Sequence, residues 1–428
     1  MKKTKHAWYK PRGYVHFDAP LGQIAAEKLV TTAGAVSRHA FYPLLRYTVE
    51  TQKIEKNKST GLVTYKDPKK RPISFAAHAD AHIYSYYAYR LTDPYETELR
   101  KAGLDASVLA FRALGKSNIQ FANHAFELIK RMGSCVAFAT DITGFFDNLD
   151  HKHLKKAWTG LIGLRSLPPD HFAVFKSLTK FAYVSLEQAL LALGISPHNP
   201  PRSPARLCSP QVFREKIRGA GIVEKHNDRK GIPQGSPISA LLSNIYLLEF
   251  DQRLLAEIQR RGGRYMRYCD DILCVVPDGQ EANLFDLVEG LIGEYGLAIN
   301  GEKTDTIYFG QFGAELKAQR PLQYLGFTFD GTRKLIRSSA FAKFSDKMRR
   351  GVSLARQSAK KHNKRRSSSI PIWKRNLYER YSHLGSRNFI RYGLRAADEM
   401  DSRAIKRQLR PLWSRLEQKI AQANANLL

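Results

Sequence analysis

The chain has few cysteines and no long apolar run. Four cysteines occur among 428 residues, without the paired spacing of a zinc site: Cys135, Cys208, Cys269 and Cys274. Scattered thiols of this kind do not form a disulfide framework, so we expect reduced cysteines and a cytoplasmic protein. No apolar stretch approaches the roughly 18 residues of a membrane-spanning helix, and none follows the basic residues 1–5. We therefore expect neither a membrane protein nor a secreted one.

Acidic residues are also scarce. Asp and Glu number 39 against 69 Lys and Arg, which leaves a formal charge of +30. A surface of this charge favours a polyanionic partner, and nucleic acid is the first candidate, with an anionic membrane as the alternative. The excess is uneven, because residues 331–428 hold 25 Lys and Arg but 6 Asp and Glu. The last quarter of the chain is therefore the most basic part.

Against this basic background, two adjacent aspartates are the most informative feature. Asp270 and Asp271 lie between the runs 264–268 and 272–276, which are rich in aromatic and branched residues. These runs predict two strands joined by a tight hairpin with the acidic pair at its tip. Two carboxylates at one turn repel each other unless a divalent cation neutralises them, and their hard oxygen atoms suit Mg²⁺ or Mn²⁺. A solvated turn is the alternative.

A second predicted strand also ends in a carboxylate. Residues 135–140 are mostly apolar and lead to Asp141, after which the chain turns at Gly144. If the two strands are neighbours, Asp141 meets Asp270 or Asp271, and together they can hold two metal ions. Two ions roughly 3.5–4 Å apart can bind both the attacking and the leaving oxygen of a phosphoryl transfer. The pattern therefore predicts a metal-dependent site of phosphoryl-transfer chemistry.

Four segments resemble, in their order along the chain, the palm of a bacterial reverse transcriptase. They are the strand ending at Asp141, residues 231–237 (GIPQGSP), residues 268–271 (YCDD) and residues 323–327 (QYLGF), the last similar to the family's primer-grip turn. The resemblance covers roughly residues 66–330. It implies an α+β fold: a right-hand polymerase with fingers and palm, built of an antiparallel sheet plus helices, and a C-terminal helical thumb.

We therefore predict three parts: an N-terminal extension (1–65), the reverse transcriptase fingers and palm (66–330) and a basic helical thumb (331–428). Within the first part, the polar stretch 51–61 reads as a loop. Within the thumb, Pro411 should kink or restart a predicted helix. The basic run 360–369 has two interpretations, a disordered loop or an RNA-binding segment.

The resemblance also implies roles for individual residues. Asp141, Asp270 and Asp271 would be catalytic and, with Ile142, would bind two Mg²⁺ ions, for which Mn²⁺ can substitute. Deoxynucleoside triphosphates would be the substrates. Four further contacts are implied: Arg71 at the triphosphate, Phe146 beneath the sugar, Gln234 near the template–nucleotide pair and Lys303 near the leaving pyrophosphate. A guanidinium group suits the role of Arg71 because it can donate two parallel hydrogen bonds to the oxygens of a phosphate group. Core packing remains the alternative for Phe146, and a plain surface lysine for Lys303.

Among bacterial reverse transcriptases, whose group II intron and retron members have a similar palm, the chain most resembles the stand-alone defence-associated enzymes. Near its C-terminal end it shows no Cys/His cluster, and Cys269 replaces the alanine common in the mobile-intron and retron enzymes. This resemblance implies that a dedicated noncoding RNA is copied into cDNA, giving an RNA–DNA duplex, in anti-phage defence. The alternatives are a retron-type or intron-derived enzyme, or an RNA-binding maturase or scaffold with an idle active site.

Overall fold

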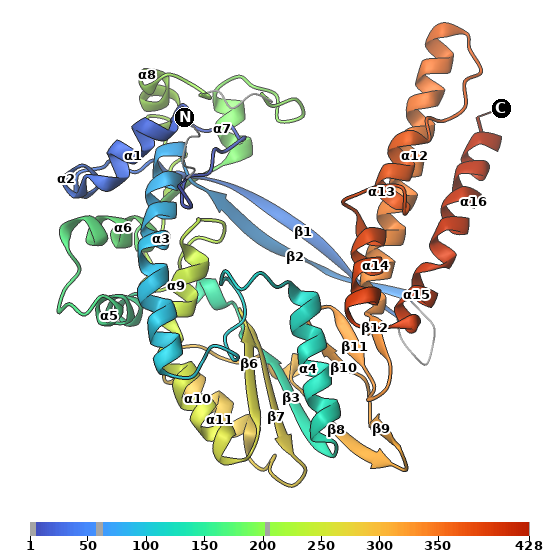
Figure 1. Ribbon diagram of the computed structural model, residues 1–428. Coiled ribbons are helices and arrows are strands. Elements are labelled where there is room, and N and C mark those ends of the chain that lie inside the picture. The colour runs from blue at the N-terminus through green and yellow to red at the C-terminus, as the bar shows by residue number, and fades with distance from the viewer. Residues whose placement is uncertain (1–5, 57–62, 202–205, 428) are drawn as a thin grey trace, which may run out of the picture.

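A computed structural model describes residues 6–56, 63–201 and 206–427. Within these ranges the strands form three sheets, and the chain has the three parts that the resemblance implies, namely fingers, palm and thumb (Figure 1). The predicted α+β fold class is therefore confirmed. None of the described helices is both long enough and apolar enough to cross a membrane.

The palm is a sheet with the strand order β6-β7-β3-β8-β9. Its strands are β3 (Cys135–Asp141), β6 (Arg264–Tyr268), β7 (Asp271–Pro277), β8 (Asp305–Phe312) and β9 (Glu315–Ala318). Helices cover both of its faces: α4 (Asn118–Met132) on one, and α9 (Ser239–Tyr246), α10 (Leu248–Arg260) and α11 (Leu284–Gly293) on the other. Alternate residues of β3 point to opposite faces, so Val136 packs in the α10–α11 core and Ala137 in the α4 core. Burial of both faces explains why this strand is almost continuously apolar.

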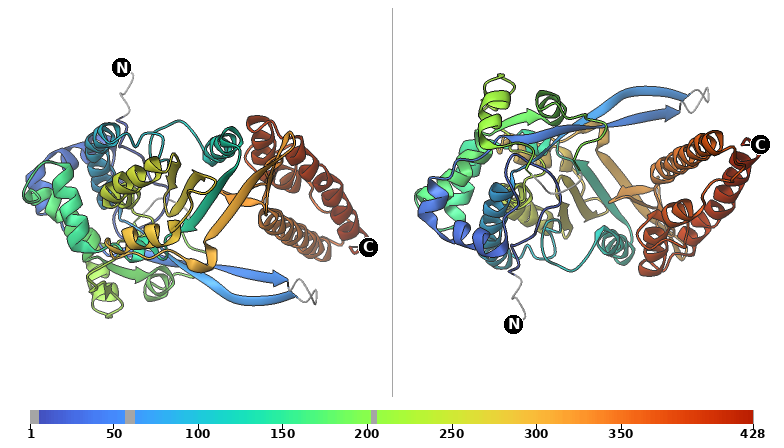
Figure 2. Two further views of the ribbon diagram at one scale, coloured as in Figure 1. Left: turned by 90° about the horizontal axis from the view of Figure 1, so that it is seen from below. Right: turned by 90° about the horizontal axis from the view of Figure 1, so that it is seen from above.

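The fingers contain a second sheet, with the strand order β2-β1-β4-β5. Its strands are β1 (Leu44–Lys56), β2 (Val63–Phe75), β4 (Ala182–Ser185) and β5 (Glu224–Lys225). The β1–β2 hairpin projects from the fingers in the direction of the thumb (Figure 2). The predicted domain boundary after residue 65 falls inside β2, and β1, which was assigned to the extension, is a fingers strand. The predicted loop 51–61 is strand as far as Lys56, and residues 57–61 lie outside the described residues.

Helices complete the fingers and join them to the palm. In chain order they are α1 (Gln23–Thr31), α2 (Ala33–Ser37), α3 (His78–Lys101), α5 (His151–Leu161), α6 (Pro169–Thr179), α7 (Leu186–Ala192), α8 (Pro210–Val212) and the π-helical turn η2 (Phe213–Arg218). The N-terminal segment is part of this structure, because Asp18 caps α3. Its two carboxylate oxygens each accept a hydrogen bond of 2.9 Å, from the N–H groups of His78 and Ala79.

The thumb is helical, as predicted. Its helices are α12 (Ser338–Arg366), α13 (Arg375–Tyr381), α14 (Phe389–Glu399), α15 (Arg403–Leu409) and α16 (Pro411–Ala425), and Pro411 does restart the helix. A small sheet of β10 (Leu322–Tyr324), β11 (Phe327–Phe329) and β12 (Lys334–Ile336) joins thumb to palm, so the predicted boundary at 330 falls within it. The buried Lys334 donates to Asn123 and Glu127 of α4 at 2.6 and 2.5 Å, which fastens the base of the thumb to the palm.

Candidate active site

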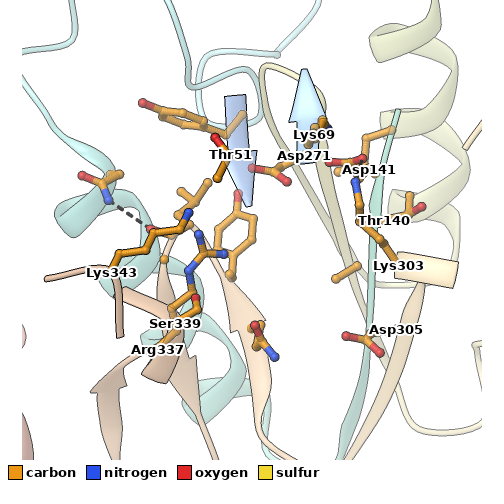
Figure 3. Close-up of a pocket in the computed structure, with 18 of the residues that line it drawn as sticks. Thr51, Lys69, Thr140, Asp141, Asp271, Lys303, Asp305, Arg337, Ser339 and Lys343 are labelled. Atoms are coloured by element: carbon orange, nitrogen blue, oxygen red, sulfur yellow. Dashed lines mark hydrogen bonds and ion pairs between the residues drawn. The ribbon is translucent and has the colours of Figure 1, made fainter. Parts of the chain in front are cut away.

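A cavity of about 1020 Å³ lies where the palm, the β1–β2 hairpin and the base of the thumb meet (Figure 3). The palm contributes the carboxylates and Lys303, whereas the hairpin and the thumb contribute the other cations. The charged residues that line it are Lys69, Arg71, Asp141, Asp271, Lys303, Asp305, Arg337 and Lys343. The cavity therefore has an acidic floor and a basic rim.

The two predicted acidic strand ends meet on this floor. Strands β3 and β7 are antiparallel neighbours, and Asp141 lies directly opposite Asp271 in their register. Cys269, with a positive φ of 61°, forms the tight turn between β6 and β7. The predicted hairpin and strand neighbours are therefore confirmed. Asp270 lies in the turn and is not among the residues that line the cavity; its carbonyl accepts a 3.0 Å hydrogen bond from the N–H of Ile142.

Lys303 lies against the first of these carboxylates. Its Nζ is 2.5 Å from Oδ2 of Asp141. The lysine ends a short 3₁₀ helix, Gly301–Lys303, and the N–H of the preceding Asn300 donates to the Asp141 carbonyl at 2.8 Å. The backbone thus holds the lysine beside the Asp141 carboxylate.

The second carboxylate is in an unfavourable environment. Burial, together with the negative charges of Asp270 and Asp141, raises the pKa of Asp271 to about 7, although Lys303 and Arg337 oppose the shift. Like charges that crowd together in this way favour binding of a cation. The edge of the palm sheet where Asp141 and Asp271 meet is therefore a site that a divalent ion would stabilise.

The donor set can be compared with the needs of Mg²⁺. Among the described residues, no three Asp, Glu, His or Cys side chains are grouped closely enough to hold an ion by themselves. Mg²⁺, however, is commonly bound by one or two carboxylates, with water and substrate phosphates completing its shell. Asp141 and Asp271 provide that number of carboxylates, in a cavity whose basic rim suits phosphates. These residues fit an ion that binds together with a triphosphate.

The raised pKa predicts a pH-dependent affinity for metal. A divalent ion requires the Asp271 carboxylate in its ionised form, so the metal affinity should fall about tenfold per pH unit below pH 7 and level off above it. Titration with Mn²⁺, followed by the paramagnetic signal of the free ion, would measure the affinity. Because the pKa lies above its ordinary value of 3.8, the ionisation of Asp271 also lowers the folding stability as the pH rises from about 4 to 7. In Asp141→Asn the midpoint should move to lower pH; an affinity independent of pH would contradict the assignment.

Two predicted nucleotide contacts, Gln234 and Phe146, are not among the residues that line the cavity. The Gln234 carbonyl accepts a 2.9 Å hydrogen bond from the N–H of Ser74 in β2, and the Phe146 carbonyl accepts one of 2.9 Å from Ile232. Gly235 follows with φ 106°, and a Cβ there would lie 2.4 Å from the Ser74 oxygen. The glycine is thus required where the palm turn meets the fingers. Arg71, in contrast, does line the cavity, in agreement with its predicted position.

Sequence reasoning missed a buried ion pair behind the acidic turn. Arg267 and Asp251 are both fully buried and form two hydrogen bonds, Nε–Oδ1 at 2.7 Å and Nη2–Oδ2 at 2.6 Å. The remaining guanidinium nitrogen, Nη1, donates to the carbonyl of Cys269 at 3.0 Å and to Asn244 at 3.1 Å. The pair therefore supports the turn that carries the aspartates. The sequence signal for this buried ion pair was an arginine within the strand that leads to the acidic pair.

Comparison with protein families gives one match over most of the chain. The model of "Reverse transcriptase (RNA-dependent DNA polymerase)" matches residues 63–329. Two curated relatives are telomerase reverse transcriptases. The Mus musculus protein is 43% identical over 77 residues, which is 18% of this chain and 7% of that protein. The Oryzias latipes protein is 28% identical over 107 residues, 24% of this chain and 10% of that protein. The aligned segments are thus a tenth or less of these relatives.

Solved structures of telomerase are also similar. Apo telomerase from Candida tropicalis aligns with a TM-score of 0.39 and 13% identity, over 67% of this chain and 48% of that one. Telomerase from Candida albicans, in complex with a TWJ fragment of telomeric RNA, aligns with a TM-score of 0.39 and 12% identity, over 94% of this chain and 66% of that one.

Proposed function

This chain belongs to the reverse transcriptase family, and on that premise we propose that it is an RNA-directed DNA polymerase that acts by two-metal nucleotidyl transfer in the cytoplasm. One observation carries the proposal: Asp141 and Asp271 lie opposite each other on the floor of a cavity rimmed by cations. Carboxylates bind metal ions, and the surrounding Lys and Arg side chains bind phosphates. Both halves of a metal–triphosphate complex therefore have matching groups in one cavity.

The reaction assigns a role to each group. Asp141 and Asp271, with Asp270 and Ile142 as predicted partners, would hold Mg²⁺, which when bound acidifies the primer 3′-hydroxyl and neutralises the triphosphate. Arg71, on β2 at the rim, binds the phosphate oxygens of the incoming deoxynucleotide and orients them. Lys303, held beside Asp141, neutralises the leaving pyrophosphate or donates a proton to it.

Phe146 is proposed to select deoxynucleotides through contact with the sugar. The neighbouring Phe145 is buried, whereas Phe146 is half-buried and packs only against the edge of the core. A ring that collides with a ribose 2′-hydroxyl costs about 1–3 kcal/mol, so Phe146→Ala should raise ribonucleotide incorporation roughly ten- to a hundredfold. Competition between a ribonucleotide and its deoxy analogue in primer extension measures this. Phe146→Tyr, which keeps the ring, is the control. Unchanged selectivity in Phe146→Ala would rule out this role of Phe146 in selecting deoxynucleotides.

The template is proposed to be a dedicated noncoding RNA, copied in anti-phage defence as in the bacterial enzymes that the motifs resemble. The formal charge of +30 supports binding of a large RNA. Retron-type, intron-derived and scaffold roles are the alternatives.

Sequencing of the nucleic acid that copurifies with the protein tests the template directly. One dominant structured RNA with complementary DNA, the DNA absent from an Asp270→Ala/Asp271→Ala variant, supports the proposal. Heterogeneous RNA without DNA in either sample favours the maturase or scaffold. Loss of phage protection in the same double variant would tie the biological role to catalysis.

A further inference from the structure

The far end of the thumb carries a basic surface outside the active site. Helix α12 is continuous from Ser338 to Arg366. Lys343 lines the cavity, and Arg366 lies 23 residues further along, or roughly 34 Å at 1.5 Å per residue. Figure 1 shows this end of α12 pointing away from the palm sheet. The cations at the end of the helix are therefore too far away to act on a nucleotide in the cavity.

This surface, which we call the thumb tip, consists of residues 360–375. The segment contains seven Lys and Arg and no Asp or Glu. Its exposed basic residues are Lys360, Lys361, Lys364, Arg365, Arg366, Lys374 and Arg375. Arg375 pairs with Glu379 at 3.1 Å, but no described acidic side chain forms an ion pair with the five cations that end α12. The thumb tip therefore presents uncompensated positive charge.

The thumb tip is ordered, which excludes the interpretation of its basic run as a disordered loop. Asn363 joins the end of the helix to the chain that follows, since its Oδ1 accepts from the N–H of Ile370 at 3.1 Å and its Nδ2 donates to the Ile370 carbonyl at 3.0 Å. Two residues later, Ile372 is buried, and its N–H donates to Asn424 of α16 at 2.9 Å. The turn is thus held from both sides before any ligand binds.

An aromatic ring lies on this preformed turn. Trp373 is 47% exposed, and its ring meets His362 edge to face, with centroids 5.4 Å apart. An exposed ring among cations is the arrangement by which proteins hold unpaired bases, with bases stacked on the ring and phosphates on the charges. Ser367 and Ser369 are exposed residues of the same turn, and a serine hydroxyl can form a hydrogen bond with a ribose 2′-hydroxyl, which DNA lacks.

We propose that the thumb tip is a second nucleic-acid site, which binds an unpaired segment of RNA outside the active-site cavity. The identification of that RNA with the template rests on the proposed function, whereas binding itself does not. Trp373 stacks on a base, and Lys364 and Arg365 bind the flanking phosphates. The site thereby holds the RNA partner while its copied part passes through the cavity.

Full-length protein tests this with a labelled, unstructured RNA of about 12 nucleotides, within the usual site size of single-strand binding proteins. An unlabelled RNA–DNA duplex too short to reach the tip is added in excess to occupy the cavity. Trp373→Ala should weaken binding of the RNA roughly tenfold, with no change in the slope of log K against log salt concentration. Lys364→Glu/Arg365→Glu should weaken it at least tenfold and reduce the slope of log K against log salt by about 1.4, the value for two phosphate contacts.

The matched control is Lys152→Glu/Lys156→Glu, the same charge change on α5, on the fingers side of the molecule. It should leave the RNA affinity unchanged, and every variant should extend the short primer–template at the wild-type rate. Equal losses in the control, equal binding of DNA of the same sequence, or slower extension by Trp373→Ala would each overturn the proposal. If wild-type protein fails to extend primers yet binds RNA through the tip, the proposed function fails and the site stands.

Discussion

Replacing Asp141 with Asn is expected to slow primer extension by roughly a thousandfold, a loss of about 4 kcal/mol of transition-state stabilisation. The substitution leaves Asp271 as the one carboxylate of the opposed pair and removes the anion beside Lys303. The same result is expected for Asp271→Asn. Single-turnover addition of one deoxynucleotide to an annealed primer measures the chemical step, and a binding assay with the same primer–template should show little change.

The cavity provides its own control for this prediction. Asp305 lines the same cavity on β8, next to β3, but pairs with Arg320 at 2.7 Å and not with the two carboxylates. Asp305→Asn removes the same charge and should extend primers at nearly the wild-type rate. If Asp305→Asn extended primers as slowly as Asp141→Asn, the loss of activity would follow from the removal of any negative charge in the cavity, and not from the loss of one particular carboxylate. Asp270→Ala should also abolish synthesis, and an active Asp270→Ala protein would remove Asp270 from the metal set.

Arg267→Met is expected to lower the free energy of unfolding by about 3–5 kcal/mol, because it leaves the fully buried Asp251 without its cation. The change also removes the donor to the Cys269 carbonyl, so the turn that carries Asp270 loses a support. Urea denaturation followed by circular dichroism gives the stability. Activity at a temperature where the variant remains folded then reports on the turn separately.

Two further variants separate burial from charge. The double variant Arg267→Met/Asp251→Leu leaves no unpaired buried charge, so it should be more stable than Arg267→Met alone. Arg253→Met breaks a pair with Glu294 that is also doubly bonded, at 2.5 and 2.8 Å, but lies on the surface. Solvent screens that pair, and little change is expected. Equal losses for the two single variants would contradict the role given to burial.

The acidic floor of the site could be predicted because its signals are local. Strand β3 is apolar at nearly every position, and β6 and β7 flank a two-residue turn, so the sequence alone indicated strands ending at Asp141 and Asp271. That these strands are neighbours was implied by the resemblance, because the four motifs occur in the order of the reverse transcriptase palm. The position of Arg71 at the cavity was implied by the resemblance, in which it matches a basic residue of the fingers.

Other features depend on partners that are distant in the sequence. The outer half of β1 is a strand because it pairs with β2, although its polar sequence reads as a loop. Arg267 reads as a surface cation until Asp251, which lies on α10, is placed beside it. The thumb residue Arg337 reaches the cavity only because the small sheet β10–β12 turns the chain back toward the palm. Tertiary contacts of this kind leave no periodic pattern.

Helix α12 has a geometric consequence for copying. It contains no proline, and it connects the cavity residue Lys343 to the thumb tip as one helix. Its length between these points equals about ten stacked nucleotides, at roughly 3.4 Å each for a strand and 1.5 Å per helical residue. An RNA anchored at the tip would therefore present to the cavity a nucleotide about ten positions away from the anchor. The length of α12 would thus define the first template position that is copied.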